Sequence, residues 1–349
     1  HSLGAQEQTV SAKISYYIKN KKKKKHKPMK ILFITSTRIG DAVLSTCLLQ
    51  HLEKVHPEAR FTIACGALSA PLFEDFEKVD QLIALTSKKY GKHWIEIWTK
   101  AIGTKWDLVI DLRGSALAFL VRAKKRLIWR SKAVKKHRVE QLCDLLKGAG
   151  YEITHPQPHL WLSTRRLQKI PSIKDSAEVP IIAVAPLANW PGKEWPHSQM
   201  IDLLKRVHSK GGPFQGARFA FFAAPNEQDR LADFKSHFDE KDLIDVGGYS
   251  HLLDVASLMK QCDFFIGNDS GLMHMAAALG LPTLGLFGPS YDMFYHPWGK
   301  KTHFLRTPEP PQDLIDQADA GNEDLLMQNL TVQEVYRSIK DLAILYKIR

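Results

Sequence analysis

The stretch that decides the fold class is Phe264-Phe265-Ile266-Gly267-Asn268-Asp269-Ser270-Gly271-Leu272-Met273-His274, where an apolar run passes through a short polar loop into a helical pattern. The apolar residues predict a buried strand, and the alanine-rich residues after the loop predict a helix. Asp269 or Ser270 can cap this helix, and His274 lies in its first turns. A helix that begins directly after a strand offers free N–H groups and a positive dipole end to a phosphate. The alternative is an ordinary N-cap beside a histidine that is satisfied in the core.

Strand and helix alternate along the chain from residue 29 onward. In the first half, the pattern predicts strands at 30–35, 61–65, 81–85, 108–111 and 126–129, with helices at 41–56, 94–102 and 140–147. In the second half, it predicts strands at 181–185, 218–222, 243–246, 264–267 and 283–287, with helices at 198–209, 226–238, 252–260 and 271–279. We expect helix 41–56 to be amphipathic. Alternation of this kind predicts a parallel sheet with helices on both faces.

Chain length and a break in the pattern predict two domains. At 349 residues the chain exceeds what one hydrophobic core usually organises. Residues 162–180 are rich in Ser, Lys, Arg and Pro, so we place the linker at 166–180, between a domain of 29–165 and a domain of 181–349. The closing helix, 332–346, is expected to pack back across the hinge, and the basic tail, 1–28, is expected to be disordered. The predicted fold class is α/β, with two doubly wound, Rossmann-like domains and a ligand cleft between them.

Positive charge is concentrated in two parts of the chain. The net charge is +12, yet residues 1–28 hold eight lysines against one glutamate, and residues 88–138 hold fifteen Lys or Arg against three acids. The remainder is therefore net acidic. Trp94, Trp98, Trp106 and Trp129 are interleaved with the second basic stretch, which favours a membrane-surface or acceptor-facing patch over a merely solvated face. An anionic partner is expected: phospholipid headgroups, a phosphorylated glycolipid or nucleic acid.

Cysteine use and hydropathy favour a cytoplasmic protein that does not span a membrane. Cys47, Cys65, Cys143 and Cys262 lie far apart without metal-ligand spacing, so we expect reduced thiols and no disulfide. No uncharged apolar stretch reaches the roughly 20 residues of a spanning helix. Residues 21–25 are lysines, but no apolar core follows them, which argues against a secretory signal.

Three further segments, beside the opening stretch and the later Phe287-Gly288-Pro289, combine a predicted strand end with a polar loop. They are Ile31-Leu32-Phe33-Ile34-Thr35-Ser36-Thr37-Arg38-Ile39-Gly40-Asp41-Ala42-Val43-Leu44, Pro186-Leu187-Ala188-Asn189-Trp190-Pro191-Gly192-Lys193-Glu194-Trp195-Pro196 and Ala223-Ala224-Pro225-Asn226-Glu227-Gln228. Together these segments resemble the lipopolysaccharide heptosyltransferase family, glycosyltransferase family 9, whose pattern reads Asp-Thr/Ser-Gly-x-x-His and later Phe-Gly-Pro. The resemblance implies a GT-B fold and an inverting glycosyltransferase that moves heptose, or a related sugar, from an ADP-sugar such as ADP-heptose to the Kdo-lipid A inner core in lipopolysaccharide biosynthesis.

The same resemblance implies two catalytic residues. Asp41, in the Gly-Asp loop after the first strand, would be the general base that deprotonates the acceptor hydroxyl. Without the resemblance, Asp41 reads as an N-cap after Gly40. Lys193, in the loop that ends in Lys-x-Trp-Pro, would neutralise charge on the leaving diphosphate. The chain departs from the family at Ala188-Asn189, where the classical members carry Thr-Thr, and Asn189 is the expected donor contact there.

Further residues are expected to bind the two substrates. Glu227 would bond the ribose of the donor, although it reads equally well as a first-turn acid of a helix. Tyr249 would line the same pocket, and the donor diphosphate would be held by Asp269, Ser270, Gly271 and His274. The carboxylates and phosphates of the acceptor would match Arg113, Arg122, Arg126 and Arg130.

The sequence lacks the common motifs for metal-diphosphate, zinc, serine-hydrolase, P-loop and dinucleotide sites, so we expect a metal-independent reaction without a cofactor. His155 and His159 lie in a proline-rich turn and are expected to be solvated.

The expected partners are a nucleotide-sugar donor, an anionic glycolipid acceptor and the cytoplasmic face of the inner membrane, without nucleic acid. Two alternatives stay open: a nucleotide-sugar epimerase or hydrolase of similar fold, and a basic nucleic-acid binder, which would leave the Asp269 segment unexplained.

Overall fold

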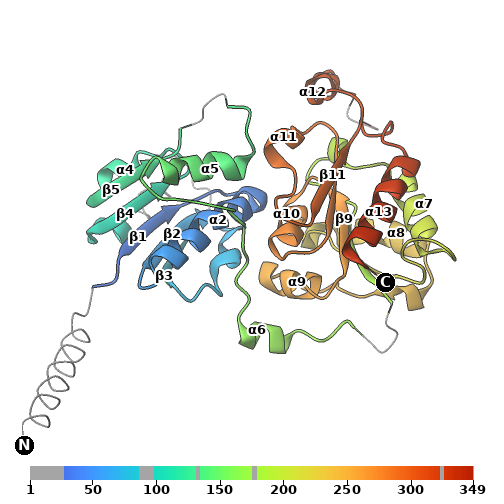
Figure 1. Ribbon diagram of the computed structural model, residues 1–349, viewed down its shortest axis with the longest axis horizontal. Helices are drawn as coiled ribbons and strands as arrows, with labels where there is room; N and C mark the ends of the chain where they lie inside the picture. Colours follow the sequence, from blue (N-terminus) through green and yellow to red (C-terminus); the bar gives the residue numbers. More distant parts are fainter. Residues whose placement is uncertain (1–26, 86–97, 131–133, 175–178, 323–325, 349) are drawn as a thin grey trace, which may run out of the picture.

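The computed structural model describes residues 27–85, 98–130, 134–174, 179–322 and 326–348, which form two α/β domains side by side (Figure 1). The first domain is built on a five-stranded sheet in the order β3-β2-β1-β4-β5, and all its pairings are parallel. Its strands are β1 (Lys30–Ile34), β2 (Arg60–Gly66), β3 (Val79–Leu85), β4 (Trp106–Asp111) and β5 (Ala123–Ile128). Every strand predicted for the first half is therefore present.

The second domain contains a six-stranded parallel sheet in the order β11-β10-β9-β6-β7-β8. Its strands are β6 (Ile181–Ala185), β7 (Arg218–Phe221), β8 (Leu243–Ile244), β9 (Phe264–Asn268), β10 (Thr283–Phe287) and β11 (Thr302–Arg306). Strand β11 was not predicted, because it lies at the sheet edge, has no fully buried residue and therefore lacks an apolar run in its sequence.

Helices cover both sheets. They are α2 (Ile39–Val55), α4 (Leu117–Leu120), α5 (Arg138–Lys147), α6 (Thr164–Lys169), α7 (His197–His208), α8 (Leu231–Ser236), α9 (Leu252–Met259), α10 (Gly271–Ala278), α11 (Asp292–Tyr295), α12 (Pro311–Asp319) and α13 (Val332–Tyr346), with short 3-10 turns η1 (Ala70–Phe73), η3 (Pro191–Lys193), η4 (Pro225–Arg230) and η5 (Glu240–Asp242). The predicted helix 226–238 is divided into η4 and α8. Helices α4, α6, α11 and α12 were not predicted, and residues 94–97 of predicted helix 94–102 lie outside the described residues.

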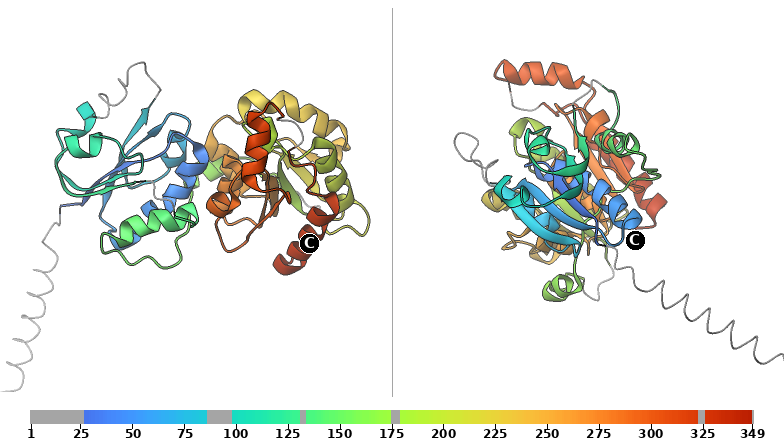
Figure 2. Two further views of the ribbon diagram at one scale, coloured as in Figure 1. Left: turned by 90° about the horizontal axis from the view of Figure 1, so that it is seen from above. Right: turned by 90° about the vertical axis from the view of Figure 1, so that its left-hand side faces the viewer.

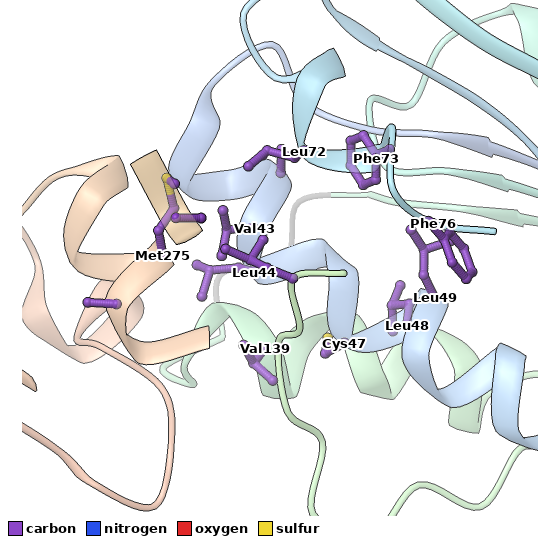
Figure 3. Close-up of a cluster of buried hydrophobic side chains, with 14 of the residues drawn as sticks. Val43, Leu44, Cys47, Leu48, Leu49, Leu72, Phe73, Phe76, Val139 and Met275 are labelled. Carbon is purple, nitrogen blue, oxygen red and sulfur yellow. The ribbon is translucent and has the colours of Figure 1, made fainter. Parts of the chain in front are cut away.

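Helix α2 is buried on almost every side, so the prediction that it is amphipathic was wrong. Residues 42–49 are all buried, and Leu52 follows on the next turn. One side packs on the sheet and on α5, and its first turns contact α10 of the second domain. Figure 3 shows Val43 and Leu44 of α2 near Met275 of α10. A helix that is hydrophobic all round belongs in the interior, and here that interior includes the domain interface.

The chain passes from one domain to the other at α6. Before this helix, the backbone N–H of Ser163 donates to Asp75 of the first domain over 2.9 Å. After it, Ile173 N–H donates to Gln261 of the second domain over 2.9 Å. The helix itself is capped by Ser163, whose hydroxyl accepts from Arg166 N–H. The crossover thus lies within the Ser- and Pro-rich stretch that lacks an apolar period.

The closing helix α13 packs within the second domain, not across the hinge as we expected. Its buried residues Val335, Ile339, Leu342 and Ala343 share one cluster with the buried face of α7. Thr331 caps its N-terminus in a capping box with Glu334. Figure 1 shows α13 beside α7, on the side of the second domain away from the first.

The two domains meet through the loops that follow their central strands. In each sheet the strand order reverses beside the first strand, between β1 and β4 and between β6 and β9. Such switch points at the carboxyl ends of parallel strands are where ligands bind in doubly wound folds. Figure 2 gives two further views of this arrangement, in which α2 and α10 lie next to each other at the interface. The fold therefore brings the loop before Asp41 and the loop that contains Asp269 to one place.

Candidate active site

Lys193 and Asp269 form an ion pair at the switch point of the second sheet. Lys193 lies in the turn after β6 and Asp269 in the loop after β9, and these two strands are direct neighbours. The distance from Lys193 Nζ to Asp269 Oδ2 is 2.7 Å. Their side chains are 27% and 10% exposed, so the ion pair is largely shielded from solvent.

Two buried polar residues, Asn268 and Glu194, hold the loop that carries Lys193, and neither was singled out from the sequence. Asn268 accepts from Trp195 N–H over 3.1 Å and donates to the Pro186 carbonyl over 2.6 Å. Glu194 accepts from Ala188 N–H over 3.0 Å. Both Asn268 and Glu194 stand next to predicted site residues in the sequence. Their polar character inside apolar surroundings is the signal that could have indicated a supporting role.

Glu194 also connects this loop to η4. Its Oε2 atom accepts from His197 Nε2 over 3.2 Å and from Arg230 over 2.7 Å. Burial alone would raise the pKa of Glu194, but the hydrogen bonds from His197, Ala188 and Arg230 outweigh it and lower the pKa. Glu194 is therefore ionised at neutral pH and fixes the position of its neighbour Lys193.

The N-terminus of α10 has no side-chain cap, contrary to our prediction for Asp269 or Ser270. Ser270 occupies the N-cap position, but its side chain accepts no hydrogen bond from the helix. Within the described residues, Ser270 Oγ, His274 Nδ1 and Ser290 Oγ are buried without a hydrogen-bond partner. Buried polar atoms are almost always paired in folded proteins. Three unpaired ones at the ends of β9 and β10 indicate a place where a ligand supplies the missing hydrogen bonds.

His274 lies at the centre of the domain interface. It is 4% exposed. Burial lowers the pKa of His274, and the nearby carboxylates of Asp269 and Asp41 oppose that shift without reversing it. The ring is therefore neutral at physiological pH. A neutral imidazole can donate from one nitrogen and accept at the other, which suits a phosphate or a hydroxyl group.

Asp41 reaches this site from the first domain. It is half-buried in the first turn of α2, and no described residue donates a hydrogen bond to its carboxylate. Its neighbour Gly40 is so close to the second domain that a Cβ atom added there would lie 2.9 Å from His274 Cδ2. A Cβ added to Gly271 would lie 2.9 Å from Ile39 Cγ2. The two glycines permit the helix ends to meet, with the Asp41 carboxylate at the junction.

The remaining predicted donor residues surround the same strand ends of the second sheet. Asn189 is exposed in the loop after β6, and Tyr249 is half-buried after β8. Glu227 lies in η4, where its carboxylate accepts from Ala224 N–H over 3.3 Å and lies 3.8 Å from Arg230. The structural role proposed for Glu227, a first-turn acid, is thus present in the structure, and a contact with a ribose stays a prediction.

The four predicted acceptor arginines do not lie together. Arg113 follows the carboxyl end of β4 and Arg130 follows that of β5, on the edge of the sheet from which Asp41 projects. Arg122 lies at the opposite edge, because it precedes β5 and its carbonyl accepts from Trp106 N–H at the start of β4. The Arg126 guanidinium donates to the carbonyls of Ala118, Val121 and Ala123. Arg122 and Arg126 are accordingly placed away from the site, a correction to the predicted set.

Other predicted features have mixed outcomes. His155 is exposed, whereas His159 is half-buried, and burial lowers its pKa, so the expectation of a solvated pair was wrong for His159. Within the described residues, the four cysteines are free and buried, and no three potential metal ligands of the His, Cys, Asp or Glu type lie together. The same part of the chain contains no helix that is long and apolar enough to cross a membrane. Trp94 lies outside the described residues.

Two doubly wound, Rossmann-like domains that face each other across an interface are the arrangement of the GT-B class of glycosyltransferase folds. The chain belongs to glycosyltransferase family 9 (heptosyltransferase), whose profile matches residues 96–320, more than half of its length. Lipopolysaccharide heptosyltransferase 2 of Salmonella typhimurium is 24% identical over 311 residues, which cover 80% of this chain and 88% of that protein. Lipopolysaccharide heptosyltransferase 1 of the same organism is 23% identical over 312 residues, 80% of this chain and 95% of that protein.

Solved structures show the same fold. The Escherichia coli heptosyltransferase WaaC with ADP superposes with a TM-score of 0.70 at 19% identity, covering 90% of this chain and all of that one. A family 9 glycosyltransferase from Veillonella parvula gives a TM-score of 0.74 at 21% identity over 90% of this chain and 97% of that one. The GT-B fold predicted from the resemblance is thereby confirmed, and the chain is a family 9 glycosyltransferase.

Proposed function

We propose that this enzyme transfers heptose, or a closely related sugar, from an ADP-sugar to the Kdo-lipid A inner core in lipopolysaccharide biosynthesis, with inversion at the anomeric carbon and without a metal ion. The observation that carries the proposal is that Asp41 of the first domain and Lys193 of the second both lie close enough to His274 to influence its pKa. A base for the attacking hydroxyl and a cation for the leaving group, held near one another, are what a single displacement uses.

Asp41 is the proposed general base. Its carboxylate takes the proton of the acceptor hydroxyl while that oxygen forms a bond to the anomeric carbon and the bond from this carbon to the diphosphate oxygen breaks. One displacement from the face opposite the leaving group inverts the configuration. The half-buried position of Asp41, without a donor among the described residues, leaves its oxygens able to accept that proton.

Lys193 and the N-terminus of α10 are the proposed site of the leaving ADP. The Lys193 ammonium, the free N–H groups of the helix and the Ser270 hydroxyl all face negative charge that grows on the diphosphate as the glycosidic bond breaks. Neutral His274 adds a hydrogen bond without a charge. ADP as the nucleotide is supported by solved relatives, WaaC with ADP and with ADP-2-deoxy-2-fluoro heptose.

The acceptor is proposed to approach from the first domain. Arg113 and Arg130 are exposed beyond the carboxyl ends of β4 and β5, on the same edge of the sheet as Asp41. Arginine pairs with the carboxylates and phosphates that an inner-core glycolipid carries. The curated relatives named as lipopolysaccharide heptosyltransferases support this class of acceptor. A glycolipid acceptor also supports a location at the cytoplasmic face of the inner membrane.

The test is transfer from ADP-heptose to Kdo-lipid A by the purified enzyme, compared with the Asp41→Asn variant. The amide cannot accept the proton, so turnover should fall by about 10² to 10⁴, while ADP should still raise the melting temperature as it does for the wild type. Asp313→Asn is the matched control, because Asp313 is an exposed first-turn acid of α12. Near-normal turnover by Asp41→Asn would rule out this base, and release of heptose without an acceptor would favour a hydrolase.

A further inference from the structure

Arg230 contacts carboxylates from two different loops of the second domain. Its Nη2 atom donates to Glu194 Oε2 over 2.7 Å, and its Nη1 atom lies 3.8 Å from Glu227 Oε1. Glu194 follows Lys193 in the loop after β6, whereas Glu227 lies in η4, after β7. Strands β6 and β7 are direct neighbours in the second sheet. One guanidinium therefore joins the loops at the carboxyl ends of two adjacent strands.

The contact with Glu194 is a pair with a buried carboxylate. The Glu194 side chain is 6% exposed, and that of Arg230 is 41% exposed. Glu194 Oε1 accepts from Ala188 N–H, while Oε2 is shared between His197 and Arg230. A buried charge that loses one of its partners is left partly uncompensated. Arg230 thus helps to keep Glu194, and with it the adjoining backbone of Lys193, in place.

The contact with Glu227 leaves that carboxylate able to bind a ligand. A separation of 3.8 Å is an ion pair but is too long for a hydrogen bond. Glu227 Oε2 accepts from Ala224 N–H over 3.3 Å, while Oε1 accepts no hydrogen bond from the part of the chain that the structure describes. Arg230 therefore attracts Oε1 electrostatically and leaves its lone pairs available for hydroxyl groups.

Arg230 differs from an ordinary surface pair of the same domain. Arg206 and Asp202 lie one turn apart on α7, and their side chains are both exposed, so this pair acts within a single helix. Arg230 and Glu194, in contrast, are 36 residues apart in the sequence. A pair between two loops fixes the position of one loop relative to the other.

We propose that Arg230 is a positioning residue that sets the spacing between the diphosphate end and the ribose end of the donor site, and so makes the enzyme select nucleotides with intact ribose hydroxyls. The inference rests on the proposed function, in particular on a donor site in which Lys193 meets the diphosphate and Glu227 the ribose. Arg230 acts through Glu194 and Glu227 and does not contact the nucleotide. Its planar guanidinium suits this task, because its N–H groups can meet two carboxylates at a fixed separation.

The experiment compares the binding of ADP and of 2′,3′-dideoxy-ADP to the full chain by calorimetric titration. The wild type should bind ADP at least about tenfold more tightly, since a site built to bond hydroxyl groups rejects an analogue that lacks them. In Arg230→Gln, the preference for ADP should shrink to about threefold or less, because Glu227 is no longer held toward the ribose. A loss of stability alone would weaken the binding of both nucleotides equally and would leave this preference unchanged.

Three further variants separate positioning from charge. Arg230→Lys keeps a cation beside buried Glu194 but replaces the guanidinium by a single ammonium. It should melt near the wild type and show an intermediate preference. Glu227→Gln should lose the preference, and the addition of Arg230→Gln should not reduce it further, because the two residues act on the same contact. Arg206→Gln is the control and should leave both affinities unchanged.

Two results would overturn the inference. The first is a wild-type preference for ADP in both Arg230→Gln and Arg230→Lys, which would leave Arg230 with a role in stability only. The second is equal binding of the two nucleotides by the wild type, which would remove the ribose contact itself. Both measurements need neither heptose nor acceptor. Absence of heptose transfer by a wild type that prefers ADP would therefore contradict the proposed reaction and leave the role of Arg230 intact.

Discussion

Lys193 Nζ lies 2.7 Å from Asp269 Oδ2, so the cation proposed to hold the donor diphosphate is paired with a carboxylate at the helix terminus proposed to bind the same group. The pair keeps the lysine extended from its loop toward α10. A diphosphate that enters must share the ammonium with Asp269. Charge in this site is therefore balanced before the donor arrives, and the carboxylate fixes the lysine position in advance.

Replacement of Lys193 by Gln should reduce turnover by about 10² to 10³, because one preorganised cation no longer meets the charge on the leaving group. Affinity for ADP should also fall, since the Asp269 carboxylate then faces the diphosphate without its partner. Steady-state kinetics and calorimetric titration with ADP measure the two effects. Lys205→Gln, a change in the last turn of α7, is the control. Unchanged ADP affinity in Lys193→Gln would contradict the proposed diphosphate site.

Replacement of Gly40 by Ala should disturb the contact between the two domains at α2 and α10. Alanine inside a helix is intrinsically better than glycine by about 1 kcal/mol, so a mild stabilisation of α2 is the expectation from local structure alone. The added Cβ, however, would lie 2.9 Å from His274 Cδ2, and the buried ring must move to accommodate it. We therefore expect lower turnover with a melting temperature close to that of the wild type.

Gly103→Ala is the matched control for Gly40→Ala, because a Cβ at Gly103 meets nothing within 4 Å. Turnover should be unaffected in the control. If Gly40→Ala also retains full turnover, the close approach of α2 and α10 is not required for the reaction.

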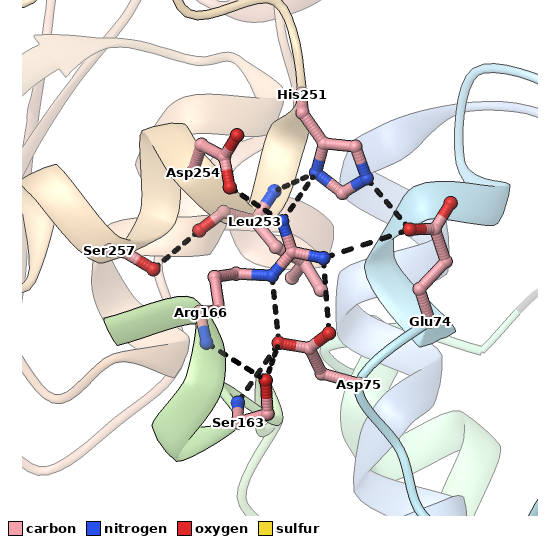
Figure 4. Close-up of polar contacts among 8 residues, drawn as sticks. All are labelled: Glu74, Asp75, Ser163, Arg166, His251, Leu253, Asp254 and Ser257. Atoms are coloured by element: carbon pink, nitrogen blue, oxygen red, sulfur yellow. Dashed lines mark hydrogen bonds and ion pairs between the residues drawn. The ribbon is translucent and has the colours of Figure 1, made fainter. Parts of the chain in front are cut away.

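Arg166 connects the two domains through the linker helix, as Figure 4 shows. Its guanidinium lies 2.7 Å from Asp75 of the first domain and 2.5 Å from Asp254 of the second. Arg166→Gln leaves the nearly buried Asp75 without its cation, and we expect a loss of about 2 to 4 kcal/mol in the free energy of unfolding. Urea unfolding measures it. Arg206→Gln, which breaks an exposed pair with Asp202, should cost less than about 1 kcal/mol.

The effect of Arg166→Gln should depend on pH. Burial alone would raise the pKa of Asp75, but hydrogen bonds from Arg166 and Ser163 outweigh it and lower the pKa. A carboxyl whose folded pKa is depressed contributes stability above its unfolded pKa of about 3.9 and loses it as pH falls through the folded value. The difference between wild type and variant should therefore shrink below pH ~4. A difference that stays constant in acid would exclude the Asp75 pair as its source.

His137 should make the protein less stable in mild acid. Burial lowers its pKa to about 3, so the folded state keeps the ring neutral while the unfolded chain takes up a proton below pH ~6.5. Stability is then fully present above pH ~6.5 and falls by up to about 1.4 kcal/mol for each pH unit below it, toward the folded pKa. The neutral ring caps α5 through Nδ1 and donates from Nε2 to the His296 carbonyl of the second domain over 2.9 Å.

His137→Asn tests this, because asparagine is a good N-cap but does not titrate. Urea unfolding of both proteins at pH 7 and pH 5 should show that the wild type loses about 2 kcal/mol more than the variant over this range. Equal losses would mean that His137 is protonated in the folded state.

The sequence was sufficient to predict the strands of the two central sheets, because apolar runs such as residues 31–34 and 264–267 are buried on both faces. Asp41 and Lys193 were nominated by the resemblance to the family, whereas His274 was nominated by its place in the first turns of a helix that follows a predicted strand. Edge strand β11 escaped prediction because a half-exposed strand has no such pattern. The roles of Glu194 and Asn268 were not predicted, because both residues support a loop through hydrogen bonds and the sequence does not identify hydrogen-bond partners.

What the sequence alone determined about this protein is local: strand, loop and helix order, and the residues that stand at strand ends. Only the tertiary structure decided which of these residues share a site. It placed Arg122 at the far edge of the first sheet, engaged Arg126 with backbone carbonyls, and packed α13 on α7. The reason is physical: periodicity records which face of an element is apolar, whereas the approach of Gly40 to His274 depends on how two separately folded sheets pack together.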